Sequence, residues 1–264
     1  MSEAFASRLR WWRSRRGVSQ LDLAVRAGVS QRHVSFLEIS RTEPSREMVL
    51  RLASALELPL RQQNELLHAA GFAAIWRETP LGAPELAAID KALAFMLAQQ
   101  EPFPAVVVDR RWNMLRANRG AKRLVAFLTG AQLDGIDPEH PINLADALVA
   151  PDALRPLLLN WREVAAYFVR GVQSDAVADG TEETRSLLDR LLAYPGVAEL
   201  LRSAPVEQTP TPVLPMEFAK DGTELRLFTT IATLGTPQDI TLQEIRVECF
   251  FPADAGTERL LRSW

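Results

Sequence analysis

The chain has 264 residues, of which 47% are hydrophobic and 24% are charged, the proportions of an ordinary globular protein. Its length suits two domains, and no apolar run is long enough to span a membrane. The single cysteine, Cys249, excludes an internal disulfide and a cysteine-based structural zinc site. The N-terminus lacks the pattern of a signal peptide, so we expect a cytoplasmic protein.

The net charge of −3 conceals an asymmetry along the chain. Residues 1–77 contain twelve Arg and seven Asp or Glu, a net charge of +5, whereas residues 78–264 carry −8. All twelve basic residues of the first part are Arg, whose planar guanidinium suits phosphate and guanine. This asymmetry predicts a nucleic-acid-binding domain followed by a domain that does not contact DNA.

Two short helices joined by a tight turn are predicted within residues 19–38, after a first helix over residues 3–15. Ser19 and Ser30 are candidate N-caps for the two helices. Gly28 ends the earlier one, because glycine adopts the left-handed conformation without a steric penalty. Val34 and Leu37 lie three residues apart and share the inward face of the second helix. The pattern is typical of a helix-turn-helix motif, with a helical hairpin in an ordinary bundle as the alternative.

The outward face of the second helix carries side chains that can recognise bases. Gln can bond bidentately to adenine and Arg to guanine in the major groove, while Phe36 either reaches a thymine methyl or packs in the bundle. The residues that we expect at base edges are Gln31, Arg32, Ser35 and Phe36. The residues that we expect to contact the DNA backbone are Arg16, Gln20 and Arg41.

A fourth helix is predicted from Arg46 after the N-cap Ser45, and a fifth from Pro59 to about Ala70, which completes an all-α five-helix bundle over residues 1–77. The run RLRWWRSRRGVSQLDLAVRAGVSQRHVSFLEISRTEPS resembles the lambda/434-repressor-like (XRE) class of DNA-binding domains. Ser40 departs from that class, which usually has Gly there. The resemblance implies binding to an operator in double-stranded DNA, commonly as a homodimer on two half-sites.

Residues 78–100 are expected to form a linker and a connector helix, with the Pro- and Gly-containing stretch 79–84 followed by an amphipathic helix over 85–99. Residues 101–264 form the second predicted domain. Its strands are predicted at 105–109, 113–118, 213–219, 224–234 and 241–251, and its helices at 121–128, 143–148, 151–173, 184–193 and 197–202. The Asp221-Gly222 pair predicts a hairpin turn. This arrangement is an α+β domain with a five-stranded antiparallel sheet.

The stretches PFPAVVVDRRWNMLRAN, NWREVA and LFTTIATLGTPQDITLQEIRVECFFPAD resemble the MmyB-like transcription-regulator ligand-binding domain. The resemblance implies a PAS-like fold and a small apolar ligand such as a fatty acid. The apolar residues that we expect in the pocket are Phe127, Leu148, Trp161, Phe168, Phe228 and Phe250, each of which plain core packing also explains. Arg162 is the candidate cation for a ligand carboxylate.

Catalysis finds little support in the sequence. The three histidines, His33, His68 and His140, have no partners at metal-ligand spacing, and no motif of hydrolases or nucleotide-binding enzymes occurs. We therefore expect no metal, no resident cofactor and no enzyme activity, but a transcriptional regulator that senses a small ligand. Two alternatives stay open: an antitoxin-like protein whose second domain serves protein contact or dimerisation, and an enzyme that uses DNA for targeting.

Overall fold

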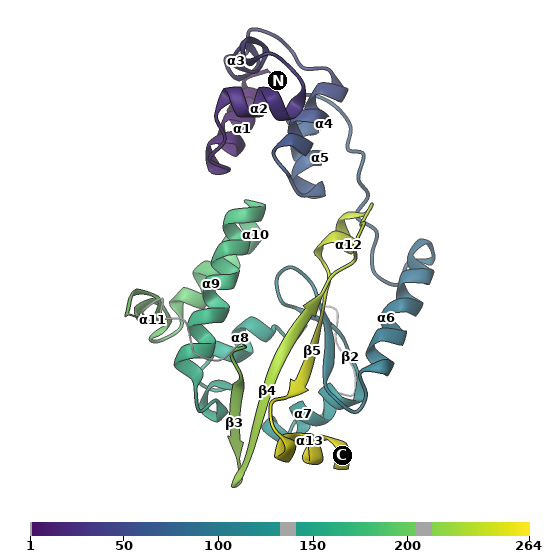
Figure 1. The fold of residues 1–264 in the computed structure, drawn as a ribbon, viewed down its shortest axis with the longest axis vertical. Helices are drawn as coiled ribbons and strands as arrows, with labels where there is room; N and C mark the ends of the chain where they lie inside the picture. Colours follow the sequence, from purple (N-terminus) through teal and green to yellow (C-terminus); the bar gives the residue numbers. More distant parts are fainter. Residues whose placement is uncertain (1, 133–140, 204–212) are drawn as a thin grey trace. The chain divides into compact units, whose positions relative to one another are not determined.

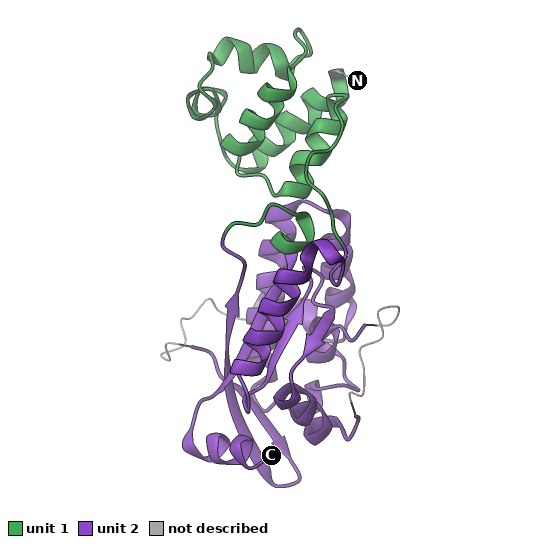
Figure 2. Ribbon diagram, turned by 90° about the vertical axis from the view of Figure 1, so that its right-hand side faces the viewer, with its two compact units in different colours: residues 1–79, 236–243 green, residues 80–235, 244–264 purple. Residues whose placement is uncertain are grey.

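The computed structural model describes residues 2–132, 141–203 and 213–264, and Figure 1 shows the course of the chain. The chain divides into two compact units: unit 1 holds residues 1–79 and 236–243, and unit 2 holds residues 80–235 and 244–264 (Figure 2). The sequence predicted a division by position along the chain and did not anticipate that residues 236–243 return to unit 1. Of the predicted candidates, His140 lies outside the described residues.

Unit 1 is the predicted five-helix bundle. Its helices are α1 (Ser2–Arg15), α2 (Gln20–Ala27), α3 (Gln31–Glu38), α4 (Arg46–Ala55) and α5 (Leu60–Ala69). Phe5, Leu9 and Trp12 of α1 are buried against the inward residues of the other helices, Val34 and Leu37 of α3 among them. The apolar spacing read from the sequence therefore assigned the core of this unit correctly.

Local capping fixes the turn between α2 and α3. The hydroxyl of Ser19 accepts a hydrogen bond from the amide of Asp22 at 3.0 Å, and that of Ser30 accepts one from the amide of His33 at 3.2 Å. Gly28 has φ 66°, the left-handed conformation that ends α2. Ser40, which stands where the XRE class usually has Gly, also has a positive φ of 57°. The backbone shape of that turn is kept although the glycine is absent.

Unit 2 contains the predicted five-stranded antiparallel sheet. Its strands are β1 (Ala105–Val108), β2 (Met114–Ala117), β3 (Met216–Lys220), β4 (Thr223–Ala232) and β5 (Arg246–Pro252), in the order β2-β1-β5-β4-β3. Asp221 and Gly222 have φ 48° and 79°, as the predicted hairpin between β3 and β4 requires. Strand β5 is the central strand of the sheet and pairs with β1 on one side and with β4 on the other.

Helices cover both faces of the sheet. They are α6 (Ala87–Gln99), α7 (Arg119–Thr129), α8 (Leu144–Val149), α9 (Trp161–Asp179), α10 (Glu182–Ala193), α11 (Val197–Ser203) and α13 (Ala255–Ser263), with short 3-10 turns at Pro84–Leu86 and Arg155–Leu157. Figure 1 shows α9 and α6 on opposite sides of the sheet. β1 is buried along its whole length, whereas β4 has exposed residues at several positions.

Two of the predicted elements are wrong in extent. The expected helix 151–173 begins only at Trp161, because Leu159 donates its amide to the carbonyl of Glu217 at 2.8 Å and so pairs with β3. The expected strand 241–251 starts at Arg246, because Ile240–Glu244 forms a short helix, α12. The side chain of Asp239 accepts from the amide of Thr241 at 2.9 Å and favours that helical turn. Helix α13 was not predicted.

Candidate functional site

A buried carboxylate holds the helix-turn-helix together. Glu38, at the end of α3, is 2% exposed. Its Oε1 accepts from Nε of Arg13 at 2.6 Å, and its Oε2 accepts from the side-chain amide nitrogen Nε2 of Gln20 at 2.7 Å. The hydrogen bond to Glu38 raises the pKa of the Arg13 guanidinium above its usual value. Glu38 therefore connects α1, α2 and α3, a role that the sequence analysis missed because a lone Glu at a helix end reads as solvated.

The residues expected at base edges lie on one side of α3. Gln31 and Arg32 are exposed in its first turn, and Ser35 is partly exposed one turn later. Phe36 is half-buried, with the guanidinium of Arg32 at 5.1 Å and that of Arg41 at 5.5 Å from its ring centroid. Cation–π contacts at these distances hold the two arginines beside the ring. Phe36 thus packs between two cations of the surface rather than in the bundle core.

Two of the expected backbone contacts have intramolecular partners. The side-chain amide of Gln20 donates to the carboxylate of Glu38, and the guanidinium of Arg16 donates to the backbone carbonyl of Glu57 at 3.3 Å. Arg16 also lies 5.6 Å from the ring centroid of Trp12. Arg41 remains exposed. Spacing from the helix-turn-helix motif could not reveal the partners of Arg16 and Gln20, because both partners lie far away in the sequence.

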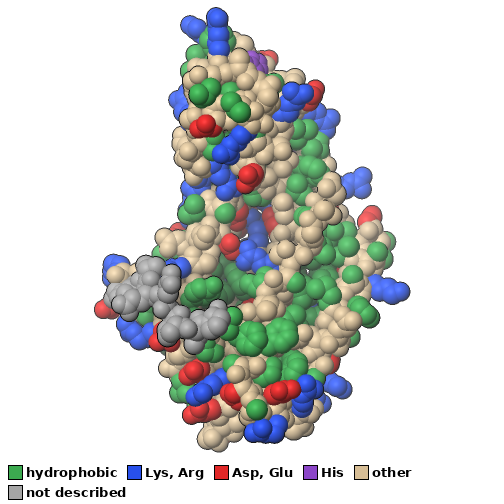
Figure 3. Space-filling view, viewed as in Figure 1, with side chains coloured by type: hydrophobic (Ala, Val, Ile, Leu, Met, Phe, Trp, Pro, Cys, Tyr) green, Lys and Arg blue, Asp and Glu red, His purple; other side chains and the backbone are tan. Residues whose placement is uncertain are grey.

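A pocket of about 640 Å³ lies between the sheet and helices α7 and α9 of unit 2. Arg246, Glu248 and Phe250 of β5 contribute to its wall, because alternate residues of a strand point to one face. Thr229 and Ile231 of β4 line it beside them. Figure 3 shows hydrophobic side chains gathered around a hollow on this unit. The wall is mostly apolar, as in most small-molecule sites.

Three of the seven residues expected in the pocket line it: Leu148, Phe168 and Phe250. Phe228 does not, because it lies one position from Thr229 and stacks instead on Phe251 at 5.5 Å. Trp161 is also outside the wall and donates its Nε1 proton to the carbonyl of Leu148 at 2.9 Å.

The remaining two expected residues, Phe127 and Arg162, also lie outside the wall. Phe127 packs on Trp264, with ring centroids 5.6 Å apart. Arg162 is exposed, because α9 turns Val164 and Phe168 toward the pocket and a residue two positions before Val164 points away. The cation of the pocket wall is instead Arg246, which the sequence analysis read only as part of a strand.

The polar groups of the wall form one cluster. Nη2 of Arg246 donates to Oδ2 of Asp175 at 2.7 Å, and its guanidinium lies 5.5 Å from the ring centroid of Trp112. Burial raises the pKa of Glu248 to about 7, against the opposing effects of Thr229 and Arg246. Within the described parts of the chain, Nε1 of Trp112 is buried and has no hydrogen-bond partner.

Both units match known families. Residues 4–66 match a helix-turn-helix domain family, and residues 89–263 match the MmyB-like transcription regulator ligand binding domain. The chain belongs to the MmyB-like family. It is accordingly a transcription regulator with a helix-turn-helix DNA-binding domain and a ligand-binding domain.

No curated protein matches this MmyB-like regulator. Among solved structures, it is similar to the PAS domain of Bordetella pertussis BvgS, with 13% identity over 67% of this chain and 95% of that chain and a TM-score of 0.27. It is also similar to an RNA-binding light-oxygen-voltage receptor, with 11% identity over 97% of this chain and 60% of that chain and a TM-score of 0.27. Scores this low carry no argument about the fold, which rests here on the observed strands.

Two further observations bear on other kinds of site. The described part of this regulator has no helix long and apolar enough to cross a bilayer. Nor do the described residues contain a group of three or more His, Cys, Asp or Glu that could hold a metal ion. The families that match the chain are regulatory, for DNA binding and for ligand binding.

The connection between β4 and β5 contributes residues 236–243 to unit 1. The carboxylate of Asp239 accepts from the hydroxyl of Thr79 at 2.6 Å and from its amide at 3.2 Å. The amide of Ile240 donates to the carbonyl of Arg77 at 2.8 Å, and Oε1 of Gln243 accepts from the amide of Leu60 at 2.8 Å. Two pocket-lining strands of the regulator are therefore joined by a segment that is bonded to the DNA-binding unit.

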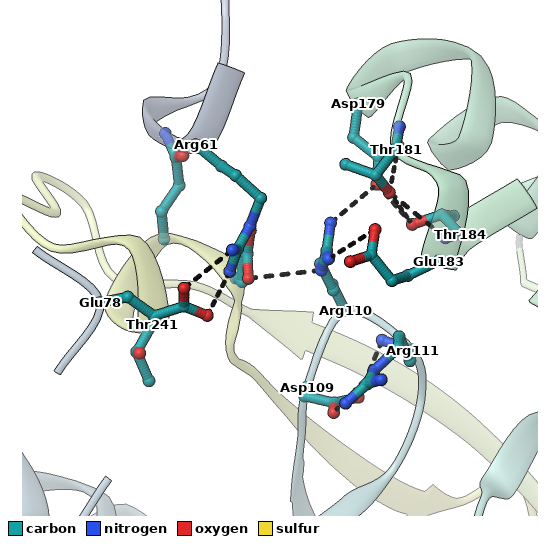
Figure 4. A network of polar contacts seen from close by, with 12 residues as sticks. Arg61, Glu78, Asp109, Arg110, Arg111, Asp179, Thr181, Glu183, Thr184 and Thr241 are labelled. Atoms are coloured by element: carbon teal, nitrogen blue, oxygen red, sulfur yellow. Dashed lines mark hydrogen bonds and ion pairs between the residues drawn. The ribbon is translucent and has the colours of Figure 1, made fainter. Parts of the chain in front are cut away.

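A charged cluster in unit 2 holds the end of that connection. Arg110, in the turn between β1 and β2, has a side chain only 12% exposed. It lies 3.4 Å from the carboxylate of Glu244, 3.3 Å from that of Glu183 and 3.9 Å from that of Asp179. Figure 4 shows its contacts with Asp179 and Glu183 as dashed lines. The residue at which the chain re-enters unit 2 is thus tied to the turn beside Trp112.

Proposed function

We propose that this regulator binds an operator sequence specifically through α3, and that a small apolar ligand in the pocket of unit 2 changes that binding. The observation that carries the proposal is the connection between β4 and β5. The same strands line the pocket with Ile231 and Glu248 and hold the segment that is bonded to unit 1 at Thr79. A shift of these strands on ligand binding acts directly on the DNA-binding unit.

Sequence recognition falls to the exposed residues of α3. Arg32 donates to guanine and Gln31 to adenine in the major groove, while Ser35 contacts a base edge one turn later. The ring of Phe36 contacts the guanidinium groups of both Arg32 and Arg41 and holds them in place. Arg41 is thereby positioned to contact a backbone phosphate. The regulator acts as a homodimer on half-sites roughly 34 Å apart.

DNA binding is tested with an operator selected by the full chain from random duplexes and with an unselected duplex. Fluorescence anisotropy should show that Arg32→Ala loses about 1–3 kcal/mol on the selected site and little on the unselected one. Arg41→Ala should weaken binding to both duplexes alike. Arg51→Ala is the matched control, because Arg51 is exposed on α4 and pairs with Glu47. Equal losses for Arg32→Ala on the two duplexes would exclude base recognition by this residue.

Ligand binding is tested by native mass spectrometry of the full chain, followed by extraction and identification of any released molecule. A bound amphiphile that changes the affinity for the selected operator supports the proposal. A chain that binds the operator with the same affinity whether or not its pocket is filled would contradict ligand control, and would leave unit 2 with a role in dimerisation or protein contact.

A further inference from the structure

The pocket has two chemically different ends, and the strand register places them. On β5, Phe250 lies beside Pro104 at one end of the wall, and Arg246 lies four residues away at the other. At roughly 3.4 Å per residue, this separation is about 14 Å. On α9, Val164, Phe168, Gly171 and Asp175 follow the same course at helical spacing, with Asp175 bonded to Arg246. The pocket is therefore long enough for a chain-like ligand.

The end at Phe250 is apolar. Phe250 packs against the cluster that contains Leu124, Val164 and Phe218, all of which also line the pocket. An alkyl chain placed there gains about 25 cal/mol for each Å² of apolar surface removed from water. This end has no charged group among the described lining residues, so it suits the tail of an amphiphile.

The opposite end has no surplus of positive charge. Its cation, Arg246, is already paired with Asp175, and the carboxyl of Glu248 is only two residues away on the same face of β5. Glu248 lies opposite Val106 and Ile231, two apolar neighbours that leave it 9% exposed. A ligand carboxylate would add a third acidic group beside one cation. Like charges placed together away from water repel strongly, so such a head group is disfavoured.

Trp112 provides the positive evidence for a polar ligand group. The residue lines the pocket and is only 6% exposed, and its Nε1 proton has no partner among the described residues. Buried indole N–H groups normally donate a hydrogen bond. A ligand that brings an acceptor satisfies this proton, whereas an ammonium group has no acceptor to offer. Glu248 and Thr229 lie in the same wall, and their oxygens can accept a hydrogen bond from the ligand.

We propose that the pocket of this regulator takes an uncharged amphiphile, such as a long-chain alcohol or amide, whose head accepts from Trp112 and donates to Glu248. The proposal rests on the ligand-binding role argued above for unit 2 and names the class of ligand. The Arg246–Asp175 pair and Glu248 disfavour a carboxylate head, and the apolar end of the pocket holds the alkyl chain.

The test compares three ligands with the same chain, decanol, decanamide and decanoate, by isothermal titration calorimetry on the full protein at about pH 8, where decanoate is ionised. We expect decanol and decanamide to bind roughly tenfold or more tightly than decanoate. Trp112→Phe keeps a ring but removes the N–H, and should weaken both uncharged ligands roughly tenfold. Trp264→Phe is the matched control, because Trp264 packs on Phe127 outside the pocket wall, and it should leave the affinities unchanged.

Asp175→Asn tests the charge argument in the opposite direction. It releases Arg246 from its ion pair, and we expect it to raise the affinity for decanoate by roughly tenfold while decanol changes little. Decanoate that binds the unaltered protein as tightly as decanol would overturn the proposed head group while leaving ligand binding intact. A protein that binds none of the three would overturn both this inference and the ligand-binding role itself. Circular dichroism of each variant establishes that it is folded.

Discussion

Glu248→Gln offers a test of the pocket's electrostatics in which the size of the stability change depends on pH. Burial raises the pKa of Glu248 from 4.5 to about 7. In the folded protein the carboxyl therefore keeps its proton up to about pH 7 and ionises above it, whereas in the unfolded chain it ionises near its usual pKa. Below pH 4.5 both states are protonated and the residue costs no stability. As pH rises from 4.5 to about 7 the unfolded state is increasingly favoured, and above that range the cost is complete.

The size of this cost follows from the shift. At about 1.4 kcal/mol per pKa unit, a rise from 4.5 to about 7 corresponds to at most about 3 kcal/mol of lost stability. Glutamine keeps a hydrogen-bonding group toward Thr229 and carries no charge, and Arg246 remains paired with Asp175. We therefore expect Glu248→Gln to raise the free energy of unfolding of unit 2 by up to about 3 kcal/mol at pH about 8. Near pH 5 the effect should be small.

Unit 2 must be followed separately from unit 1. A urea series at each pH, with pulse hydrogen exchange at one fixed labelling pH, reports unfolding through the peptides of β1 and β5. Glu224→Gln is the matched control. It makes the same chemical change on β4 at a side chain that is 60% exposed to water. If Glu248→Gln destabilised unit 2 at both pH values, or changed stability equally at both, the carboxyl would not be held neutral by burial.

Two other variants test the contacts that organise unit 1. Glu38→Ala leaves the guanidinium of Arg13 without its buried partner and should lower the free energy of unfolding of unit 1 by about 3–5 kcal/mol. Urea unfolding followed by hydrogen exchange of α1 peptides measures this, and a loss below about 1 kcal/mol would show that the pair is dispensable. Asp239→Ala removes the acceptor of Thr79. It should leave operator affinity unchanged in the ligand-free protein and reduce the change in affinity that ligand causes, as measured by anisotropy. An undiminished ligand response would exclude this contact from the coupling.

Unit 1 could be predicted well because its signals are local. Ser19, Ser30 and Ser45 each cap the helix that follows, because each hydroxyl accepts from the amide three residues later. Gly28 ends α2 with a positive φ. The contacts of Arg16 and Gln20 could not be predicted in the same way. Each depends on a partner in another helix or loop, Glu57 or Glu38, and a sequence motif does not record which way a long side chain turns.

In unit 2 strands such as β1, Ala105–Val108, were predicted because they are rich in β-branched residues, but the start of α9 was not. Leu159 pairs with β3 instead of continuing a helix, a tertiary contact that overrides local preference. The missed helix α13 had a readable signal: Asp254 caps it by accepting from the amide of Thr257 at 2.8 Å. Pocket residues were harder still, because an error of one position on a strand, as at Phe228, moves a side chain to the opposite face.

The two arms of the β4–β5 connection are unequal, which bears on how a ligand acts on the DNA-binding unit. On the β4 side, eight positions separate the pocket residue Ile231 from the anchor Asp239, and much of that stretch has no regular structure. On the β5 side, Gln243 accepts from Leu60 in unit 1 while the next residue, Glu244, pairs with Arg110 in unit 2.

Arg246, the first residue of β5, follows two positions later in the pocket wall, so only three positions separate the pocket wall from Gln243 of unit 1. A long segment without regular structure can absorb a displacement of the pocket wall, whereas a short segment bonded at adjacent residues transmits it. A ligand that changes the position of Arg246 should therefore act on unit 1 through β5 and Gln243. The uncharged head group proposed above would lie beside Trp112 and the Arg246–Asp175 pair. It would therefore bind at the end of the pocket that is nearest to Gln243 along the chain.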